Sequence, residues 1–258
     1  MTELFSDIFA GRNDVLTRMD ARAKVACAIS ALLAVLFSRN ALFPAGVFAA
    51  CLSGMFLVRI PAKWISFRIA GPAAFALVLV LLFGFTVGVT PMASGSFAGI
   101  RLTLMEEGVR RGLLLGARVL GATSVVLLLG AVTPAHRIFH VLLRAGIPAE
   151  WVEIAMLVYR YAFVLLEHAA EVSAAQRVRL GYSHPAKSMS SIGTLGGTVI
   201  LRSIDQAVRT HEAMTARGYT GSIPFGPMAS MGRRDRWVAI SVPLLFLTAW
   251  LLVGRGQG

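Results

Sequence analysis

The chain has 258 residues, of which 56% are apolar and 15% are charged, and its formal net charge is +12. A soluble domain of this length needs more charge on its surface, so these proportions exclude an ordinary soluble protein and predict a protein of the lipid bilayer. The excess charge comes almost entirely from arginines that border or interrupt apolar runs. This distribution indicates topology signals and a protein partner with acidic pockets, and it argues against nucleic-acid binding.

The start of the chain carries Glu3, Asp7 and Asp14 ahead of the first apolar run. It lacks the basic start and small-residue cleavage site of a signal peptide, so we expect the first membrane helix to be retained. Cys27 and Cys51 lie inside apolar runs, without a CxxC pattern or a nearby histidine. This setting favours small core residues over a metal site or a disulfide.

Five apolar runs are candidates for membrane spans. The first two are short, near the minimum of about 17 to 20 residues for crossing a bilayer, and predict a helical hairpin. Between the third and fourth runs we expect a Gly/Ser-rich loop. Arg118 interrupts the fourth run, at a cost of roughly 2.5 kcal/mol or more, so it should face other helices or lie near an interface. In chain order the runs are 25–37, 41–58, 69–89, 112–132 and 237–253.

The fold class that we predict is an all-α integral membrane protein with about five transmembrane helices and a domain of long amphipathic helices. The positive-inside rule places the N-terminal basic residues and the link 59–68 in the cytoplasm. Four spans then bring the chain back to the cytoplasm at Thr133. We therefore expect four spans in 1–133, a cytoplasmic domain of long amphipathic helices in 134–235 and a last transmembrane helix in 236–258. The N-terminus is expected to be cytoplasmic.

Small residues recur at short intervals on the fourth run, at Gly112, Gly116 and Gly121. Such spacing allows helix backbones to approach closely in lipid, where packing drives helix association. The pattern predicts tight packing between helices, or a sliding surface against another membrane subunit.

Two long helices are predicted in the cytoplasmic region. The first begins with Pro148 in its first turn, runs to about Leu180 and delivers Arg179 at the end of its apolar stripe. The second runs from about Ser191 to Ala216 and stops at Gly218, so it delivers Arg217 in its last turn. The first stripe comprises Trp151, Ile154, Val158, Tyr161, Leu165, His168, Val172, Ala175 and Arg179, and the second Ile200, Ile204, Val208, His211 and Met214.

Polar groups on these two helices are predicted to pair within each helix. On the second helix Arg202, Asp205, Arg209 and Glu212 share a charged side at pairing distances of three and four residues. On the first helix we expect the polar cluster of Arg160, its flanking tyrosines and the carboxylates Glu167 and Glu171 to be structural.

No motif for catalysis or for a resident metal is present. The chain has no GxxxxGK[ST] phosphate loop and no GxSxG elbow with a plausible His/Asp set. His136 and His140 are four residues apart but lack HExxH and a third ligand, so an interfacial helix face is favoured over zinc. Glu106 and Glu107 are adjacent, so on a helix they would point apart, and a solvated loop explains them better than a catalytic pair. We therefore predict no catalytic residue, no metal site and no cofactor in this chain.

Several stretches resemble the T component of energy-coupling-factor (ECF) transporters, closest to the cobalt/nickel type called CbiQ or NikQ. The entry 19–24 is similar to that family's Leu-Asp-Pro-Arg-x-Lys start, with Ala21 in place of proline. The resemblance covers most of the chain, and its other stretches are 159–167, 176–179, 202–203, 212–214 and 216–219.

The resemblance implies a non-catalytic subunit that couples two ATPase subunits, which hold ATP and Mg, to a membrane-embedded substrate-binding subunit (S component) in the bacterial inner membrane. In that family two Ala-Arg-Gly-like tripeptides dock into grooves of the ATPases. They map onto Val178-Arg179-Leu180, which departs on both sides of the arginine, and onto Ala216-Arg217-Gly218. Arg179 is preferred over Arg177 because the apolar stripe ends there.

The resemblance also implies uptake of cobalt or nickel ions. A vitamin-type ECF importer is the first alternative. An intramembrane enzyme would require His136, His140, Glu106 or Glu107 to converge in space, and a secondary transporter would work without ATPases.

Overall fold

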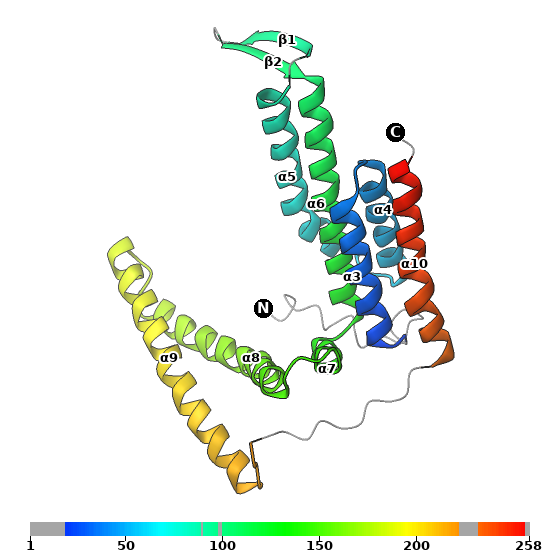
Figure 1. The fold of residues 1–258 in the computed structure, drawn as a ribbon. Coiled ribbons are helices and arrows are strands. Elements are labelled where there is room, and N and C mark those ends of the chain that lie inside the picture. The colour runs from blue at the N-terminus through cyan, green and yellow to red at the C-terminus, as the bar shows by residue number, and fades with distance from the viewer. Residues whose placement is uncertain (1–18, 89, 98–99, 222–231, 256–258) are drawn as a thin grey trace. The chain divides into compact units, whose positions relative to one another are not determined.

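The computed structural model describes residues 19–88, 90–97, 100–221 and 232–255. These residues are predominantly helical, as predicted (Figure 1). The predictions that rest on residues ahead of Met19 lie outside the described residues. The elements are α3 (Ala21–Phe37), α4 (Leu42–Leu57), α5 (Ala62–Thr86), β1 (Pro91–Phe97), β2 (Ile100–Met105), α6 (Glu106–Val132), α7 (Ala135–Arg144), α8 (Ala149–Val178), α9 (Pro185–Ala216) and α10 (Arg233–Arg255).

The chain divides into two compact units. Among the described residues, 19–141 and 232–255 form the first unit and 142–221 form the second. The first contains the apolar helices α3 to α6 and α10, and the second contains α8 and α9.

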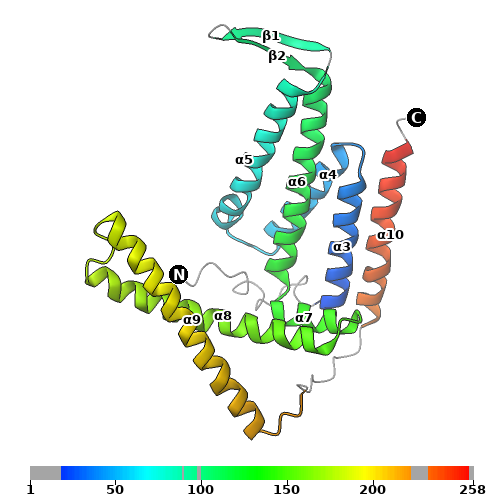
Figure 2. The same cartoon turned by 60° about the vertical axis from the view of Figure 1, so that its left-hand side comes forward.

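The central helix of the first unit is α6, and glycines mark its two contact faces. A Cβ atom at position 112 would lie 2.7 Å from the Cα atom of Val80 in α5, and one at position 121 would lie 2.9 Å from the carbonyl oxygen of Pro44 in α4. Gly116, between them, faces Ala76 of α5. All three glycines are buried. The first half of α6 therefore packs on α5 and its second half on α4, as Figure 2 shows.

One end of the first unit gathers the termini of several helices. Near the start of α3, the Nζ atom of Lys24 donates to the carbonyl oxygen of Val132 at the end of α6, over 3.2 Å. Next to it, the Cys27 Sγ atom lies 3.9 Å from the carbonyl oxygen of Val238, near the start of α10. A buried cluster joins the end of α4, the start of α5 and the end of α6; it comprises Met55, Val58, Ile60, Ile65, Ala131 and Val132. Helices that follow one another from α3 to α6 therefore run antiparallel, whereas α4 and α6 both end here and α3 and α10 both begin here.

Arg118 faces another helix, as one of the two predicted placements required. Its guanidinium donates to the carbonyl oxygen of Ser38, the C-capping residue of α3, and Ser38 is buried. The last carbonyl groups of a helix have no partner within the helix, so this arginine supplies one of the missing donors. Within the described part of the chain, its buried Nε atom has no hydrogen-bond partner.

Three helices begin at least six residues earlier than predicted. The basic link before the third apolar run is the first part of α5, which starts after Pro61, and α6 starts at Glu106 ahead of its apolar run. The helix expected from Ser191 starts at Pro185, a residue suited to a first helical turn because it has no N–H to satisfy. The apolar residues of a membrane helix occupy only its middle. The apolar runs therefore predicted α5 and α6 to be shorter than they are.

The loop predicted between the third and fourth runs is instead an antiparallel β-hairpin of β1 and β2. Apolar and polar residues alternate from Ile100 to Leu104, which is the pattern of a strand with two different faces.

Length and composition make two helices, α5 and α6, capable of crossing a bilayer among the described residues, and α4 is a shorter apolar helix. The first helical hairpin, α3 and α4, is confirmed.

Candidate functional site at the ends of two long helices

The second unit is an antiparallel pair of long helices that contact each other from the turn onward. Close to the turn, the Nε2 atom of Gln176 in α8 donates to the carbonyl oxygen of Ser191 in α9, over 3.0 Å. The phenol of Tyr182, in the turn, donates to the Gln176 Oε1 atom over 2.7 Å. The turn is therefore fixed to both helices.

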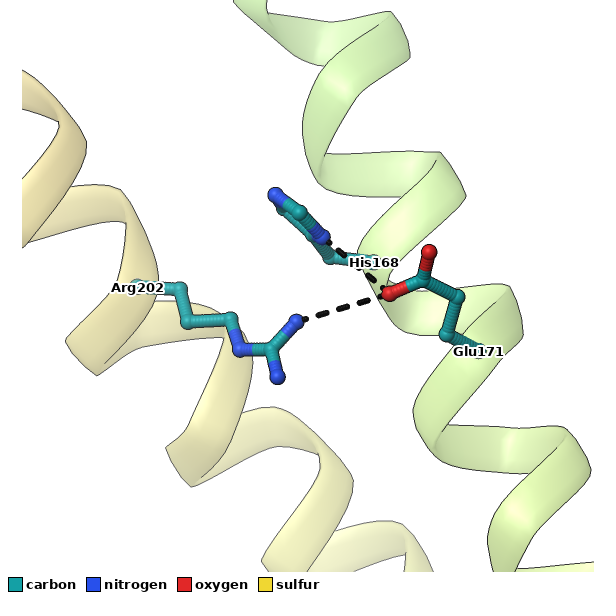
Figure 3. Close-up of polar contacts among 3 residues, drawn as sticks. All are labelled: His168, Glu171 and Arg202. Carbon is teal, nitrogen blue, oxygen red and sulfur yellow. Dashed lines mark hydrogen bonds and ion pairs between the residues drawn. The ribbon is translucent and has the colours of Figure 1, made fainter.

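Further along the pair, a carboxylate of α8 binds an arginine of α9. The Oε2 atom of Glu171 lies 3.7 Å from Arg202 and 3.4 Å from the Nδ1 atom of His168 (Figure 3). The predicted pairing of Arg202 within α9 is wrong, since its partner is across the helix interface. Asp205, Arg209 and Glu212 form no ion pair with one another in the described part of the chain.

The far end of the pair is held by two tyrosines. The hydroxyl oxygens of Tyr161 in α8 and Thr210 in α9 lie 2.9 Å apart. Just after α9, the Tyr219 phenol donates to the Oε2 atom of Glu153, a buried residue in the second turn of α8, over 3.4 Å. Partial burial and the Glu153 carboxylate raise the pKa of the Tyr219 phenol, which stays a neutral donor at physiological pH.

The two helices end in the same way. In α8 the C-capping residue is Arg179; the N–H of Leu180 donates to the carbonyl of Arg177, and the N–H of Gly181 to that of Gln176. This pattern is the Schellman motif, in which the residue after the cap adopts a left-handed conformation. Leu180 has a φ of 56°.

In α9 the C-capping residue is Arg217, and the N–H groups of Gly218 and Tyr219 donate to the carbonyls of Thr215 and Met214. Gly218 has a φ of 84°. The stretches 178–180 and 216–218 are therefore two copies of one structural motif, with Leu180 in the place of Gly218.

This equivalence distinguishes Arg179 from Arg177. Arg179 and Arg217 both cap their helices, whereas Arg177 lies two residues earlier, in the last turn. The side chains of the capping arginines are exposed, as are the flanking residues Val178, Leu180 and Ala216.

The apolar stripe of α8, which is typical of a helix that packs along one face, is only partly covered by the described residues. Trp151 is 69% exposed and Ile154 57% exposed, while Leu165 and Val172 are partly covered. On α9 the stripe residue Ile204 is 56% exposed. A heptad pattern predicts a packed face but does not say whether the partner is in the same chain.

In the polar cluster of α8 that was expected to be structural, the Arg160 guanidinium lies over the ring of Tyr161, 5.8 Å from the ring centre. Together with residues of α9 these two side chains line a groove of about 610 Å³ next to Arg217. The groove was missed because its residues are far apart in the sequence, and no single motif brings them together.

The groups considered for metal binding and catalysis belong to helices other than α8 and α9. His136 and His140 belong to α7, and Glu106 and Glu107 form the first turn of α6. Among the described residues, His, Cys, Asp and Glu side chains form no cluster of three or more that could hold a metal ion.

The apolar helices of the first unit, with a separate helical pair that carries two exposed capping arginines, define a polytopic helical membrane protein. The family model described as CbiQ, cobalt transport protein, matches residues 12–228. The chain belongs to this family of membrane-embedded cobalt transport components.

Three relatives show how the similarity is distributed. An uncharacterized protein of Methanocaldococcus jannaschii is 29% identical over 209 residues, covering 81% of this chain and 78% of the relative. The cobalt transport protein CbiQ of Rhodobacter capsulatus is 36% identical over 95 residues, covering 37% and 39%. The protein of the same name from Salmonella typhimurium is 28% identical over 155 residues, covering 58% and 68%.

Proposed function

We propose that the chain is the membrane-embedded coupling subunit of an ECF-type importer, and that Arg179 and Arg217 dock into two ATPase subunits. The observation that carries this proposal is the matched pair of capping arginines at opposite ends of one antiparallel helix pair. Because Tyr219 contacts Glu153, Arg217 lies near the start of α8. Arg179 is at the other end of α8, which puts the arginines on the order of 40 Å apart at 1.5 Å per residue.

That separation exceeds the width of a small domain, about 30 Å, and so favours two partner subunits over one. A guanidinium makes several charge-assisted hydrogen bonds in a fixed geometry, each contributing roughly 1.5 to 3 kcal/mol, so an arginine in an acidic pocket forms a stiff joint. When ATP draws the two ATPases together, both ends of the helix pair move with them. The pair then tilts the subunit that rests against it.

The exposed apolar stripes are the surface that we assign to the substrate-binding membrane subunit. Trp151 and Ile154 on α8 and Ile204 on α9 would otherwise remain in water, and large exposed apolar patches mark interaction sites. The partners in this proposal are therefore two ATPases and one membrane-embedded S component.

The proposed topology has five spans, with the N-terminus in the cytoplasm of a bacterial inner membrane. The end of the first unit where α3, α5 and α10 begin and α4 and α6 end is the cytoplasmic end, because basic residues favour that side. The basic residues at this end are Arg22, Lys24, Arg59, Lys63, Arg68, Arg137, Arg233 and Arg236.

The cargo is a transition-metal ion, cobalt or nickel, and the names of the relatives from R. capsulatus and S. typhimurium support cobalt. We propose that the chain is not catalytic and that ATP and Mg are bound by the ATPases. Cobalt would then be held by the S component.

The test replaces Arg179 and Arg217 with alanine, singly and together, with Arg177→Ala as the matched control because Arg177 is also exposed and lies in the same turn as Arg179. The readouts are co-purification of the ATPase subunits and ATP-dependent cobalt uptake into vesicles. Each single change should weaken ATPase co-purification and cobalt uptake, and the double change should abolish them. The Arg177→Ala control should show wild-type co-purification and uptake. Normal assembly and uptake in the double variant would refute the proposal.

A further inference from the structure

The groove beside Arg217 is open to solvent and rich in positive charge. It lies between the first half of α8 and the last turns of α9, and its volume is about 610 Å³. Three arginines line it, Arg160, Arg209 and Arg217, and all three are exposed. None of them has an ion-pair partner among the described residues.

Among the described residues, the Glu153 carboxylate near this groove forms no ion pair with these arginines. Glu153 is 5% exposed and accepts a hydrogen bond from Tyr219, whose ring also lines the groove. The guanidinium of Arg160 lies over the ring of Tyr161, 5.8 Å from the ring centre, so an aromatic face helps to set its position. Three guanidinium groups at one site repel one another unless an anion lies between them.

The walls of the groove are not only charged. Leu157 comes from α8, and Ala213 and Met214 come from α9. A small inorganic anion would satisfy the arginines and leave these apolar side chains in water. A peptide segment that presents carboxylates together with apolar side chains matches both parts of the lining.

We propose that this groove, defined by Arg160, Arg209, Leu157, Ala213 and Met214, receives an acidic segment of the ATPase into which Arg217 docks. The inference rests on the proposed function, since Arg217 and Gly218 border both the groove and the docking motif. The joint at this end is then reciprocal: the arginine enters the ATPase, and an acidic segment of the ATPase enters the groove. Arg160 and Arg209 are partner-recognition residues.

The test uses the full chain in nanodiscs, with the purified ATPase subunits of the same transport system as the probe. The variant is Arg160→Gln with Arg209→Gln, which removes two charges and leaves Arg217 in place. The control is Arg202→Gln, the same change on α9 at an arginine that already has Glu171 as a partner. A second variant, R160K with R209K, keeps the charges.

We expect the double glutamine variant to bind the ATPases about tenfold more weakly at low salt and to lose most of the salt dependence of binding. The control and the double lysine variant should bind the ATPases with an affinity within about twofold of wild type, because both keep the positive charge at the groove. Wild-type affinity in the double glutamine variant overturns the inference. If Arg217→Ala still loses the ATPases in that case, the proposed function stands without the groove.

Anionic lipid headgroups could also supply the negative charge that the groove binds. The binding measurement is therefore repeated in nanodiscs of phosphatidylcholine alone and in nanodiscs that contain phosphatidylglycerol. A defect of the same size in both supports a protein partner. A defect confined to the phosphatidylglycerol nanodiscs overturns the inference and assigns the groove to lipid headgroups.

Discussion

Leu180 and Gly218 occupy the same place in two copies of one helix-ending motif, each directly after a capping arginine and each in the left-handed conformation. The conformation costs a non-glycine residue about 1 to 2 kcal/mol, whereas glycine adopts it freely. The structure therefore retains a strained residue at one end of the helix pair and an unstrained one at the other.

Replacing Leu180 with glycine should raise the free energy of unfolding by about 1 kcal/mol, because the strain is removed and the side chain, 68% exposed, contributes little packing. Gly218→Ala should lower it by a similar amount, since nothing else in the motif changes. Chemical denaturation of the purified chain in detergent measures both. A loss of stability in Leu180→Gly would mean that the leucine side chain is in contact with something that offsets its strain.

Alanine at position 112 should destabilise the bundle by about 1 to 3 kcal/mol, because its Cβ atom would lie 2.7 Å from the backbone of Val80 and α6 must move away. Alanine at position 116, where the nearest contact would be 3.4 Å to the Cβ atom of Ala76, should remain within about 1 kcal/mol of wild type. Gly71→Ala in α5, with open space around the new methyl group, is the control. Equal effects at 112 and 116 would contradict the packing described for α6.

Valine at position 133 should stabilise the chain by about 1 kcal/mol. The Oγ1 atom of Thr133 is buried and has no hydrogen-bond partner among the described residues, and Thr133 lines a cavity of about 280 Å³ within the first unit. An unpaired buried hydroxyl costs free energy, and valine has nearly the same shape without it. Thr133→Ser is the control, since it keeps the hydroxyl and loses the methyl group. Destabilisation by valine in a thermal unfolding assay would show that the hydroxyl has a partner in the membrane.

Glutamine in place of Glu171 should change the free energy of unfolding by less than about 0.5 kcal/mol. The carboxylate and Arg202 are both substantially exposed, at 62% and 42% of their side chains, and exposed ion pairs contribute little. The measurement should be made on the isolated chain and on the assembled importer. A loss above about 1 kcal/mol in the isolated chain would contradict the exposed geometry.

Much of the fold follows from local patterns in the sequence. The helix from Ala149 to Val178 was predicted almost to its ends, because its apolar stripe is continuous and Pro148 and Gly181 border it. The strands of the hairpin were missed because Gly and Ser in 91–97 indicate a loop more strongly than the alternation in 100–104 indicates a strand.

The candidate site was predicted only in part. The two arginines could be found because each stands at a helix end that the sequence marks. The equivalence of Leu180 with Gly218 is a backbone property that side-chain identity conceals. The groove brings together Arg160 and Arg209, which only the antiparallel pairing of α8 and α9 places side by side.

The position of α6 has a consequence for how the protein is made. Helices α4 and α5 both pack against α6, through Gly121 and Gly112, and α6 follows them in the chain. A ribosome therefore delivers both helices to the membrane before the surface that joins them exists. During that interval their interfacial residues face lipid or an insertion chaperone, and a chain that stops before residue 106 never acquires the shared partner. We expect such truncated chains to be degraded.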